Sequence, residues 1–594
     1  MKKTSLFIIS AIACFGMASC TSILDQKPLD SFTDEAVWND LALTEANLNE
    51  VYRDVRGYLS TNTIWDNFSE EVFHKHGYGT NNTTHSLMSP DAAYICYYED
   101  NYNMWGSYYG YINTLNIFLQ HIDSVPASSE SDIEWRNEQK GQALFLRGWF
   151  YYHLYMFYGR CVIVDTPFEL DSQYDKTRAD MDDVAAFIVK DLDDAAALLP
   201  LKYSDATDFG RATKGAALAL KSKVLLLQAS PLYCPNFQTT QARWQAASDA
   251  AKAVIDLDVY SLAKIAPEGT TLSSPADVQK YVEAYAALFY DPESPEAIWE
   301  KLYNPNYENA WSDTNSTPMG QVHRAPCGPG NGFEGWGTFD PTQNLVNKIQ
   351  KYDGTPQEAY TDSLKNPWQD LEIRYWANIV GDGATWGYGD DKREVETFIA
   401  APNSGVTPGL DSSQGQYWWN ASNTGYAMRK SYSPDFNYYG TTQWNAPWMF
   451  IRLSEIYLNY AECQYNLGNN GEALKYVNKV RNRALLPDAT GDVWKAIEYE
   501  REIEMMFEGT RWIDMRRWMR MDEEYAQPVL GCQVTKYADG HKSYKLNVYV
   551  DQREWKGITG TPTGSASDYK YYIVPLSRSE YNKSPKYLDL WPYE

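Results

Sequence analysis

Apolar side chains recur with helical spacing in two parts of the chain, the first 265 residues or so and the stretch after about residue 447. A spacing of i, i+3, i+4 and i+7 places apolar side chains on one face of a helix, which can then be buried. Several of these periodic segments end near Pro or Gly, as helices do. The pattern predicts helices over residues 101–123, 130–158, 179–199, 213–230 and 241–257.

The clearest periodicity lies between residues 453 and 484 and predicts two amphipathic helices joined by a glycine-containing turn. Two such helices look like a tetratricopeptide unit. Because the repeats elsewhere are degenerate, we expect paired helices and not a regular array. The predicted inward positions are Leu453, Ile456, Tyr457, Tyr460 and Ala461 in the first helix, and Ala473, Val477, Val480 and Ala484 in the second.

The pattern changes between about residues 266 and 446, and again between 528 and 568. There Gly, Pro, Asn, Ser and aromatic residues mix without a lasting period. Irregular stretches of this length are usually either functional or disordered. The aromatic content of segments such as QYWWNASNTGY and FNYYGTTQW argues against disorder. We therefore predict a mainly α fold with little β structure, in which a helical scaffold carries long, ordered, aromatic-rich loops.

We expect one folded body over residues 35–594. It would consist of an N-terminal helical part (35–265), a loop-rich ligand-binding part (266–446) and a C-terminal helical part with a closing segment (447–594). Loops on a rigid scaffold are where binding residues concentrate. The ligand site is therefore expected on the loops.

The segment 500–518, EREIEMMFEGTRWIDMRRW, combines many charges with apolar residues at helical spacing and predicts one amphipathic helix. Arginine can pair with carboxylates through two N–H groups, which suits partly buried ion pairs. We therefore expect the charges of this segment to join helices in an ion network and not to bind a ligand. The residues concerned are Arg501, Glu504, Glu508, Arg511, Asp514 and Arg516.

The N-terminus has the layout of an export signal, because two lysines precede a mostly apolar run over residues 6–17. A helix needs about 20 residues to span a bilayer, so this run fits a cleaved signal peptide, residues 1–19. Residues 17–20, Met-Ala-Ser-Cys, resemble a bacterial lipobox, whose cysteine is lipidated and becomes the first residue of the mature protein. We predict lipidation (palmitate) of Cys20 and a polar tether over residues 20–34. A plain secretory signal with a chance cysteine is the alternative.

The mature chain is strongly acidic. Removal of residues 1–19 leaves 78 acidic against 50 basic residues, a net charge of about −28. This charge argues against nucleic acid and against an anionic membrane surface as partners. The cysteines beyond Cys20 show no C-x-x-C spacing, so they indicate neither a zinc site nor a redox motif, and one or two disulfides stay open. They are Cys96, Cys161, Cys234, Cys327, Cys463 and Cys532.

Aromatic residues make up 15% of the chain, and 47 Tyr and 21 Trp outnumber 20 Phe. Tyr and Trp combine a flat apolar face with a polar group and favour half-wet contact surfaces. Sugars have the matching character, with a C–H face that stacks on a ring and an edge of hydroxyl groups. The composition therefore favours a sugar ligand.

Catalytic motifs give an enzyme no support. The chain contains neither G-x-S-x-G nor H-E-x-x-H. The segment GNGFEG (330–335) matches a dinucleotide fingerprint only in its letters, because no strand precedes it and no helix follows. His74 and His76 are more typical of a surface loop than of a metal site. We expect no cofactor, and a structural calcium ion held by loop carboxylates stays open.

Several separated stretches together resemble the SusD/RagB family of surface glycan-binding lipoproteins of Bacteroidota. The lipobox is followed by a short tether and then, in the expected order, by the family-like segments. One departure is the end of the chain, LDLWPYE, where the family often has Q-N-P-G-Y. The matching segments are residues 140–159, 210–233, 453–484, 500–518 and 571–593.

The resemblance implies a SusD-like fold and an outer-membrane lipoprotein that faces the cell exterior and binds polysaccharide or oligosaccharide. It also implies a partner, a SusC-like TonB-dependent transporter, over which the protein sits as a lid. Capture of peptides or another non-sugar cargo by a RagB-like protein is the alternative, and a surface hydrolase is a remote third.

In this family, ligands tend to meet the loop before the second long helix and loops of the middle third. Binding residues vary between members, so the set is more credible than any single residue. The positions that correspond here are Trp65, Asp66, Tyr78, Tyr98, Asn101, Trp311, Arg324 and Trp336.

Overall fold

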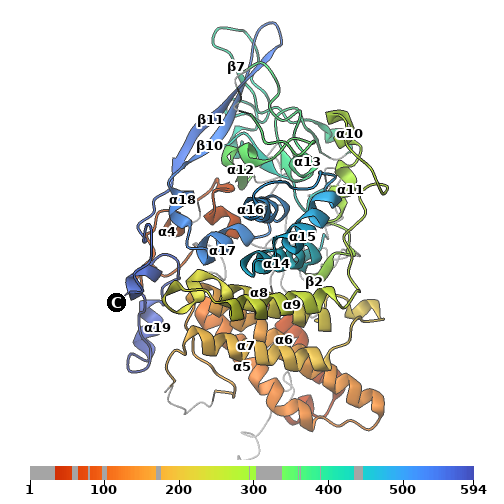
Figure 1. Cartoon of the computed structure of the whole chain (residues 1–594), viewed down its shortest axis with the longest axis vertical. Helices are drawn as coiled ribbons and strands as arrows, with labels where there is room; N and C mark the ends of the chain where they lie inside the picture. Colours follow the sequence, from red (N-terminus) through yellow and green to blue (C-terminus); the bar gives the residue numbers. More distant parts are fainter. Residues whose placement is uncertain are drawn as a thin grey trace, which may run out of the picture.

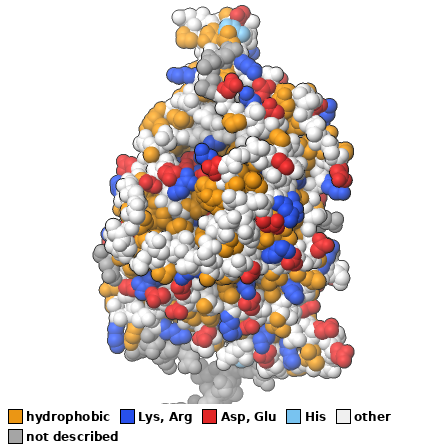
Figure 2. Space-filling model, viewed as in Figure 1, with side chains coloured by type: hydrophobic (Ala, Val, Ile, Leu, Met, Phe, Trp, Pro, Cys, Tyr) orange, Lys and Arg blue, Asp and Glu red, His pale blue; other side chains and the backbone are white. Residues whose placement is uncertain are grey.

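The computed structural model describes most of the chain. The described residues are 34–55, 64–77, 80–95, 104–168, 176–292, 294–302, 333, 337–358, 360, 363–387, 389–433 and 446–593. Helices occupy the lower and middle parts of the molecule, irregular segments lie above them, and a β-hairpin extends to the top (Figure 1). Hydrophobic side chains gather toward the middle of the viewed face, whereas charges of both signs are spread over it (Figure 2).

The helices of the N-terminal part pack against one another largely in chain order. Helix α6 contacts α7, α7 contacts α8, and α8 contacts α9 (Figure 1). Five of these helices begin and end within three residues of their predicted bounds, so the periodicity is confirmed there. The bounds are α2 (Asp34–Val37), α3 (Leu41–Asp54), α4 (Asn81–Thr84), α5 (Met104–His121), α6 (Glu130–Tyr158), α7 (Met181–Leu198), α8 (Lys214–Ala229) and α9 (Gln241–Ile255).

The C-terminal helices continue the same stack. Helix α14 contacts α9, although almost 200 residues separate them, and α15 then packs on α14. The inward positions predicted for this pair are buried, except that Tyr457 is half-buried. The helical hairpin is therefore confirmed. The bounds are α14 (Leu453–Asn466), α15 (Asn470–Arg483), α16 (Val493–Glu504), α17 (Thr510–Arg517), α18 (Met521–Tyr525) and α19 (Arg578–Lys583).

The segment between α9 and α14 contains short helices and short paired strands. Strand β1 (Val72–His74) pairs with β3 (Phe339–Pro341), and β2 (Ala297–Lys301) pairs with β9 (Trp448–Arg452), both antiparallel. These pairs join the middle of the chain to its two helical parts. The other elements here are α10 (Pro275–Gln279), α11 (Val282–Ala287), α12 (Gln343–Lys348), α13 (Ile373–Asn378), β4 (Ile379–Val380), β5 (Thr385–Trp386), β6 (Arg393–Glu394), β7 (Ile399–Ala400) and β8 (Ala427–Met428).

The prediction of irregular structure after residue 528 is wrong for its first half. Strands β10 (Pro528–Lys536) and β11 (Lys542–Gln552) form an antiparallel hairpin, and β7 lies parallel to β10 (Figure 1). The segment KLNVYV alternates apolar and polar residues, and Asp539-Gly540 lies in the turn. Alternation around a D-G turn is a hairpin signal. The sequence therefore contained the information that the prediction overlooked.

The single helix predicted over residues 500–518 is also wrong, because the structure contains two helices, α16 and α17. Phe507 (φ 63°) and Gly509 (φ 79°) between them have left-handed backbones, and the Phe507 ring is fully buried. Glycine adopts this conformation without steric cost. The break turns the chain so that α17 packs beside α16 and against the segment Trp65–Phe68.

The predicted ion network is confirmed, with one exception. Glu504 accepts hydrogen bonds from Arg452 (2.6 Å), from Arg374 (3.3 Å) and from Arg483. Asp514 pairs with Arg501 (2.9 Å) in the same way. These side chains are almost completely buried.

The exception is Arg516, which pairs with no carboxylate among the residues that the structure describes. Its guanidinium donates to the backbone carbonyls of Tyr572 (2.6 Å) and Met156 (3.2 Å), and thereby joins the closing segment to α6. A guanidinium has five N–H donors, so carbonyl oxygens can accept from it where no carboxylate is near, although Nη1 of Arg516 has no acceptor among the described residues.

We expect Glu504→Gln to destabilise the protein by about 1.5–3 kcal/mol, because charged hydrogen bonds to three buried guanidinium groups are weakened although each group keeps another carboxylate partner. Urea unfolding followed by circular dichroism measures the change. The matched control is Glu523→Gln, which removes an exposed partner of Arg520 and should cost less than about 1 kcal/mol. Equal small losses in both variants would contradict a stabilising role for the buried carboxylate.

Candidate functional site

Two adjacent tryptophans, Trp418 and Trp419, present their rings to solvent on a loop of the middle part. Their side chains are 59% and 64% exposed, and their ring centroids lie 5.7 Å apart at an interplanar angle of 71°. They begin the 3₁₀ turn Trp418–Asn420, in which Asn420 is buried. We call this pair the tryptophan platform. It is a surface for contact and not a cavity.

The loop that carries the platform is held by backbone hydrogen bonds and a close approach of two chain segments. The amide of Tyr417 donates to the carbonyl of Leu410 (2.8 Å). A Cβ atom on Gly415 would lie 2.0 Å from the carbonyl oxygen of Gly409. Only glycine fits there, so the loop can turn tightly just before the platform.

A partly buried ion pair lies close to the platform in the same loop region. Asp411 accepts two hydrogen bonds from Arg393, at 2.7 and 2.8 Å. The guanidinium of Arg393 lies over the ring of Phe333 (3.9 Å to the centroid) and farther from that of Tyr417 (5.7 Å). A bidentate pair that also stacks on aromatic rings fixes geometry well. Tyr417, the residue before the platform, is thereby held in place.

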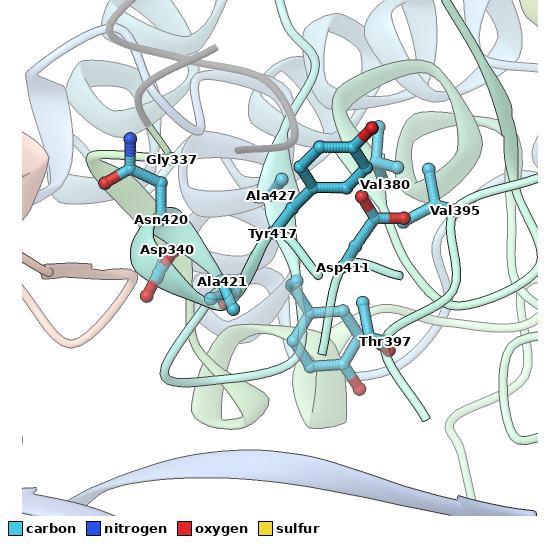
Figure 3. Close-up of a pocket in the computed structure, with 12 residues that line it drawn as sticks. Gly337, Asp340, Val380, Val395, Thr397, Asp411, Tyr417, Asn420, Ala421 and Ala427 are labelled. Atoms are coloured by element: carbon cyan, nitrogen blue, oxygen red, sulfur yellow. The ribbon is translucent and has the colours of Figure 1, made fainter. Parts of the chain in front are cut away.

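A small pocket lies beside the platform (Figure 3), with Tyr417 and Asp411 on one side and Asp340 and Asn420 on the other. Its volume is about 20 Å³, enough for a single water molecule and too small for a sugar ring. A sugar bound here would therefore lie on the platform, with the pocket at its edge. The pocket is lined by Gly337, Asp340, Val380, Val395, Thr397, Asp411, Tyr417, Asn420, Ala421, Ser422, Tyr426 and Ala427.

Asp340, on β3 at the wall of this pocket, is buried and only partly hydrogen-bonded. Its Oδ2 accepts from the amide of Asn423 (2.7 Å), whereas Oδ1 has no partner within the described part of the chain. Burial raises the pKa of Asp340 to about 7, although the Asn423 amide and the nearby Lys75 charge oppose the rise. This carboxyl group therefore titrates near neutral pH.

Two of the eight predicted ligand residues are described, and both are buried. Trp65 is 7% exposed and packs edge-on against Phe157, with ring centroids 5.2 Å apart. Asp66 accepts a hydrogen bond from the amide of Gly509 (2.8 Å) and joins the turn before α17 to the N-terminal part. The structure gives both residues a role in packing. Their contact with a ligand stays a prediction.

The other predicted ligand residues lie outside the described residues, and they too stay predictions. They are Tyr78, Tyr98, Asn101, Trp311, Arg324 and Trp336.

The tryptophan platform was not among the predicted site residues, although its segment QYWWNASNTGY had drawn attention as an aromatic loop. Periodicity cannot show which aromatic residues of an irregular loop are exposed. Two neighbouring tryptophans next to Asn and Ser were the only signal.

Two other expectations concern His74 and the cysteines. His74 belongs to β1 and is buried, so its assignment to a surface loop is wrong.

Cys161, Cys234, Cys463 and Cys532 are buried free thiols. Within the described ranges, no group of three or more His, Cys, Asp or Glu side chains is arranged to hold a metal ion.

Comparison with known protein families shows to which family the chain belongs. The family described as "SusD family" matches residues 295–590, and the family described as "Starch-binding associating with outer membrane" matches residues 24–226. The two matches together cover most of the chain. This protein belongs to the SusD/RagB family. Family members are associated with the outer membrane, as the second description states, and bind carbohydrate.

Similar proteins extend over nearly the same length. A SusD-like protein of Formosa agariphila, P25, is 22% identical over 554 residues, which cover 87% of this chain and 90% of the relative. A SusD-like protein of Bacteroides ovatus is 21% identical over 529 residues, 87% of this chain and 83% of the relative.

Solved structures show the same fold. A SusD-like protein of Bacteroides fragilis superposes with a TM-score of 0.72 at 24% identity, over 95% of this chain and 99% of the other. A SusD-like carbohydrate-binding protein of the same organism gives 0.70 at 21%, over 93% and 99%. A laminarin-binding SusD-like protein gives 0.56 at 17%, over 93% and 99%. The mainly α SusD-like fold is therefore confirmed.

The described helices include none that is both long and apolar enough to cross a membrane.

We expect Asp340→Asn to raise the free energy of unfolding clearly at pH 8 and to change it much less at pH 4. Between pH 4 and 7 the unfolded chain has released the proton of Asp340 while the folded protein retains it, so stability falls as pH rises through this window and levels above it. Asparagine resembles the protonated carboxyl group and removes the loss, worth on the order of 1–4 kcal/mol. Thermal unfolding of both proteins at the two pH values measures the effect. An equal shift at both pH values would contradict the raised pKa.

Proposed function

We propose that this protein captures polysaccharide or oligosaccharide at the cell surface, without catalysis, and delivers it to a SusC-like TonB-dependent transporter, for which it acts as a lid. The observation that carries the proposal is the tryptophan platform. Relatives described as carbohydrate-binding and laminarin-binding support a glycan as the cargo.

The exposure of two indole rings has a physical consequence. Burial of apolar surface lowers the free energy by about 25 cal/mol for every Å² removed from water. Two exposed tryptophans side by side therefore indicate a surface at which a partner or ligand binds. A sugar ring presents C–H groups that can cover an indole face, while its hydroxyl groups keep contact with water and polar side chains. Each covered ring would contribute roughly 1–3 kcal/mol.

The expected affinity is modest. A few such contacts, less the cost of immobilising the ligand, predict dissociation constants in the micromolar to millimolar range. Weak binding suits a lid that must release its cargo. A polymer that touches several anchored copies would recover affinity through avidity.

The proposed location depends on the N-terminus. Lipid on Cys20 would hold the folded body at the outer face of the outer membrane, beside its transporter, through the tether 20–34. The association of the family with the outer membrane supports this arrangement. These residues lie outside the described part of the chain.

We expect Trp418→Ala combined with Trp419→Ala to weaken binding of the cognate polysaccharide by about 10- to 100-fold, because two stacking surfaces are lost. Retardation gels with a panel of plant, host and microbial polysaccharides first identify the polymer, and the variant is then compared on it. The melting temperature should be unchanged, since both side chains are exposed.

The matched control is Tyr549→Ala, an aromatic residue of β11 with 63% exposure that lies apart from the platform in sequence. It should bind like the unchanged protein. If the platform variant retained full retardation, the platform would not be the binding surface. Binding of a peptide pool in calorimetry, with no glycan retarded, would move the assignment to peptide capture.

We expect Cys20→Ala to release the protein from the membrane fraction while glycan binding is retained. Labelled palmitate should be incorporated into the unchanged protein and not into the variant, and protease treatment of intact cells reports whether the protein faces outward. Membrane retention of Cys20→Ala without label would contradict a lipid anchor at this residue.

A further inference from the structure

A second, larger cavity adjoins β4, a strand that the small pocket beside the platform also touches. Its volume is about 390 Å³, which falls within the usual range for small-molecule sites. It opens between α11, α13, the loop that follows β4, and strand β11, and α11 packs beside α13 (Figure 1). Val380 lines both this cavity and the small pocket beside the platform, so the two spaces are adjacent.

Aromatic rings form much of the wall. Trp368 meets Tyr544 edge to face at 5.3 Å, and Tyr375 meets Trp376 at 5.2 Å. Trp386 also lines the space. Trp376 and Tyr544 are half-buried and can offer an apolar face to a small ligand, whereas Trp368, Tyr375 and Trp386 are almost completely buried behind them.

The charged groups of the wall are already paired. Arg429 donates to Glu283, and Lys542 donates to Asp382. Each cation therefore has a carboxylate partner, and the wall offers no spare charge to balance an ionic ligand. The pairing favours a neutral ligand.

Two buried donors of the wall lack an acceptor. Nε1 of Trp368 and Nε of Arg429 make no hydrogen bond to any described residue, although the Trp368 residue is 2% and the Arg429 side chain 10% exposed. Each of these nitrogens can only donate, and a buried donor without an acceptor is costly to the fold. Both nitrogens are covered by protein atoms in this structure, so a ligand that carries acceptor oxygens would satisfy them after a small shift of the wall.

The absence of a side chain at residue 381 leaves room for such a ligand. A Cβ atom on Gly381 would lie 2.9 Å from Nε1 of Trp368 and 3.0 Å from the hydroxyl of Tyr375. Both polar groups therefore border the space above Gly381, which itself lines the cavity. A methyl group there would crowd the donor and obstruct the approach of a ligand oxygen.

From these observations, we propose that this cavity binds a neutral mono- or disaccharide unit, independently of the tryptophan platform. The ring would lie among Trp368, Trp376 and Tyr544, and its hydroxyl oxygens would accept from Trp368 Nε1 and Arg429 Nε. The proposal stands on the cavity alone, so it can fail while the platform binds glycan.

Calorimetric titration of the mature chain with glucose, galactose, mannose, xylose, maltose and cellobiose tests the proposal, with galacturonate as the anionic probe. We expect at least one neutral sugar to bind with a millimolar dissociation constant. Gly381→Ala and Trp368→Phe should each weaken this binding at least about 10-fold. The double alanine variant at Trp418 and Trp419 should leave it unchanged.

Gly471→Ala is the matched glycine control, because a Cβ atom there meets nothing within 4 Å; it should bind like the unchanged protein. If Gly381→Ala does not fold, Trp368→Phe decides, because it keeps an aromatic ring in the wall and removes the N–H donor together with part of the indole. No neutral sugar bound at about 50 mM, binding of galacturonate alone, or unchanged binding in Trp368→Phe would each overturn the proposal.

The two proposals fail separately. If the platform variant loses polysaccharide retardation and the unchanged protein binds no small sugar, the platform is kept as the glycan site and the cavity proposal is rejected. If small-sugar binding disappears in Trp368→Phe and the platform variant still shows full polymer retardation, the cavity is kept as a sugar site and the platform proposal is rejected.

Discussion

The carboxylate of Glu504 lies where four segments of the chain meet. Arg452 reaches it from the end of β9, Arg483 from α15 and Arg374 from α13, and the hydroxyl of Tyr285 on α11 donates to it at 3.0 Å. A buried charge is tolerated only when it is paired and hydrogen-bonded. The helical stack and the middle part therefore have to be placed so that all these groups arrive together. Ion pairs of this kind are weak evidence for net stability, but loss of one partner is costly.

A second buried cluster has a similar effect on the N-terminal part. Arg511 on α17 pairs with Glu70 and Glu524, and Lys348 on α12 pairs with Glu70 and Glu502. Segments that are distant in sequence are thus joined by charge, beneath loops with little regular structure. This explains how long irregular segments can be ordered without long helices or strands of their own. The loop that carries the two exposed tryptophans is held by other contacts, the Tyr417–Leu410 backbone hydrogen bond and the nearby Arg393–Asp411 pair.

Local pattern was sufficient wherever one face of an element is buried along its whole length. The helices of the N-terminal part and the pair α14–α15 follow their periodicity closely, and the family resemblance agrees with the comparisons. Prediction failed where the signal was short or nonlocal. The β10–β11 hairpin was overlooked in a region judged by its Gly and aromatic content, and one helix was predicted where Gly509 allows a break.

The sequence by itself determined the helical scaffold, the family, the acidic and aromatic character of the protein, and the presence of a buried ion network. Each of these depends on residue type or on spacing within about 30 residues. Tertiary structure alone decided which charges meet, that Arg516 binds carbonyl oxygens, that Trp65 is buried and that Trp418 and Trp419 are exposed. Exposure and pairing depend on which distant segments pack against a residue. The sequence of a loop without periodicity does not show which segments those are. The binding surfaces of this protein consist of such loops.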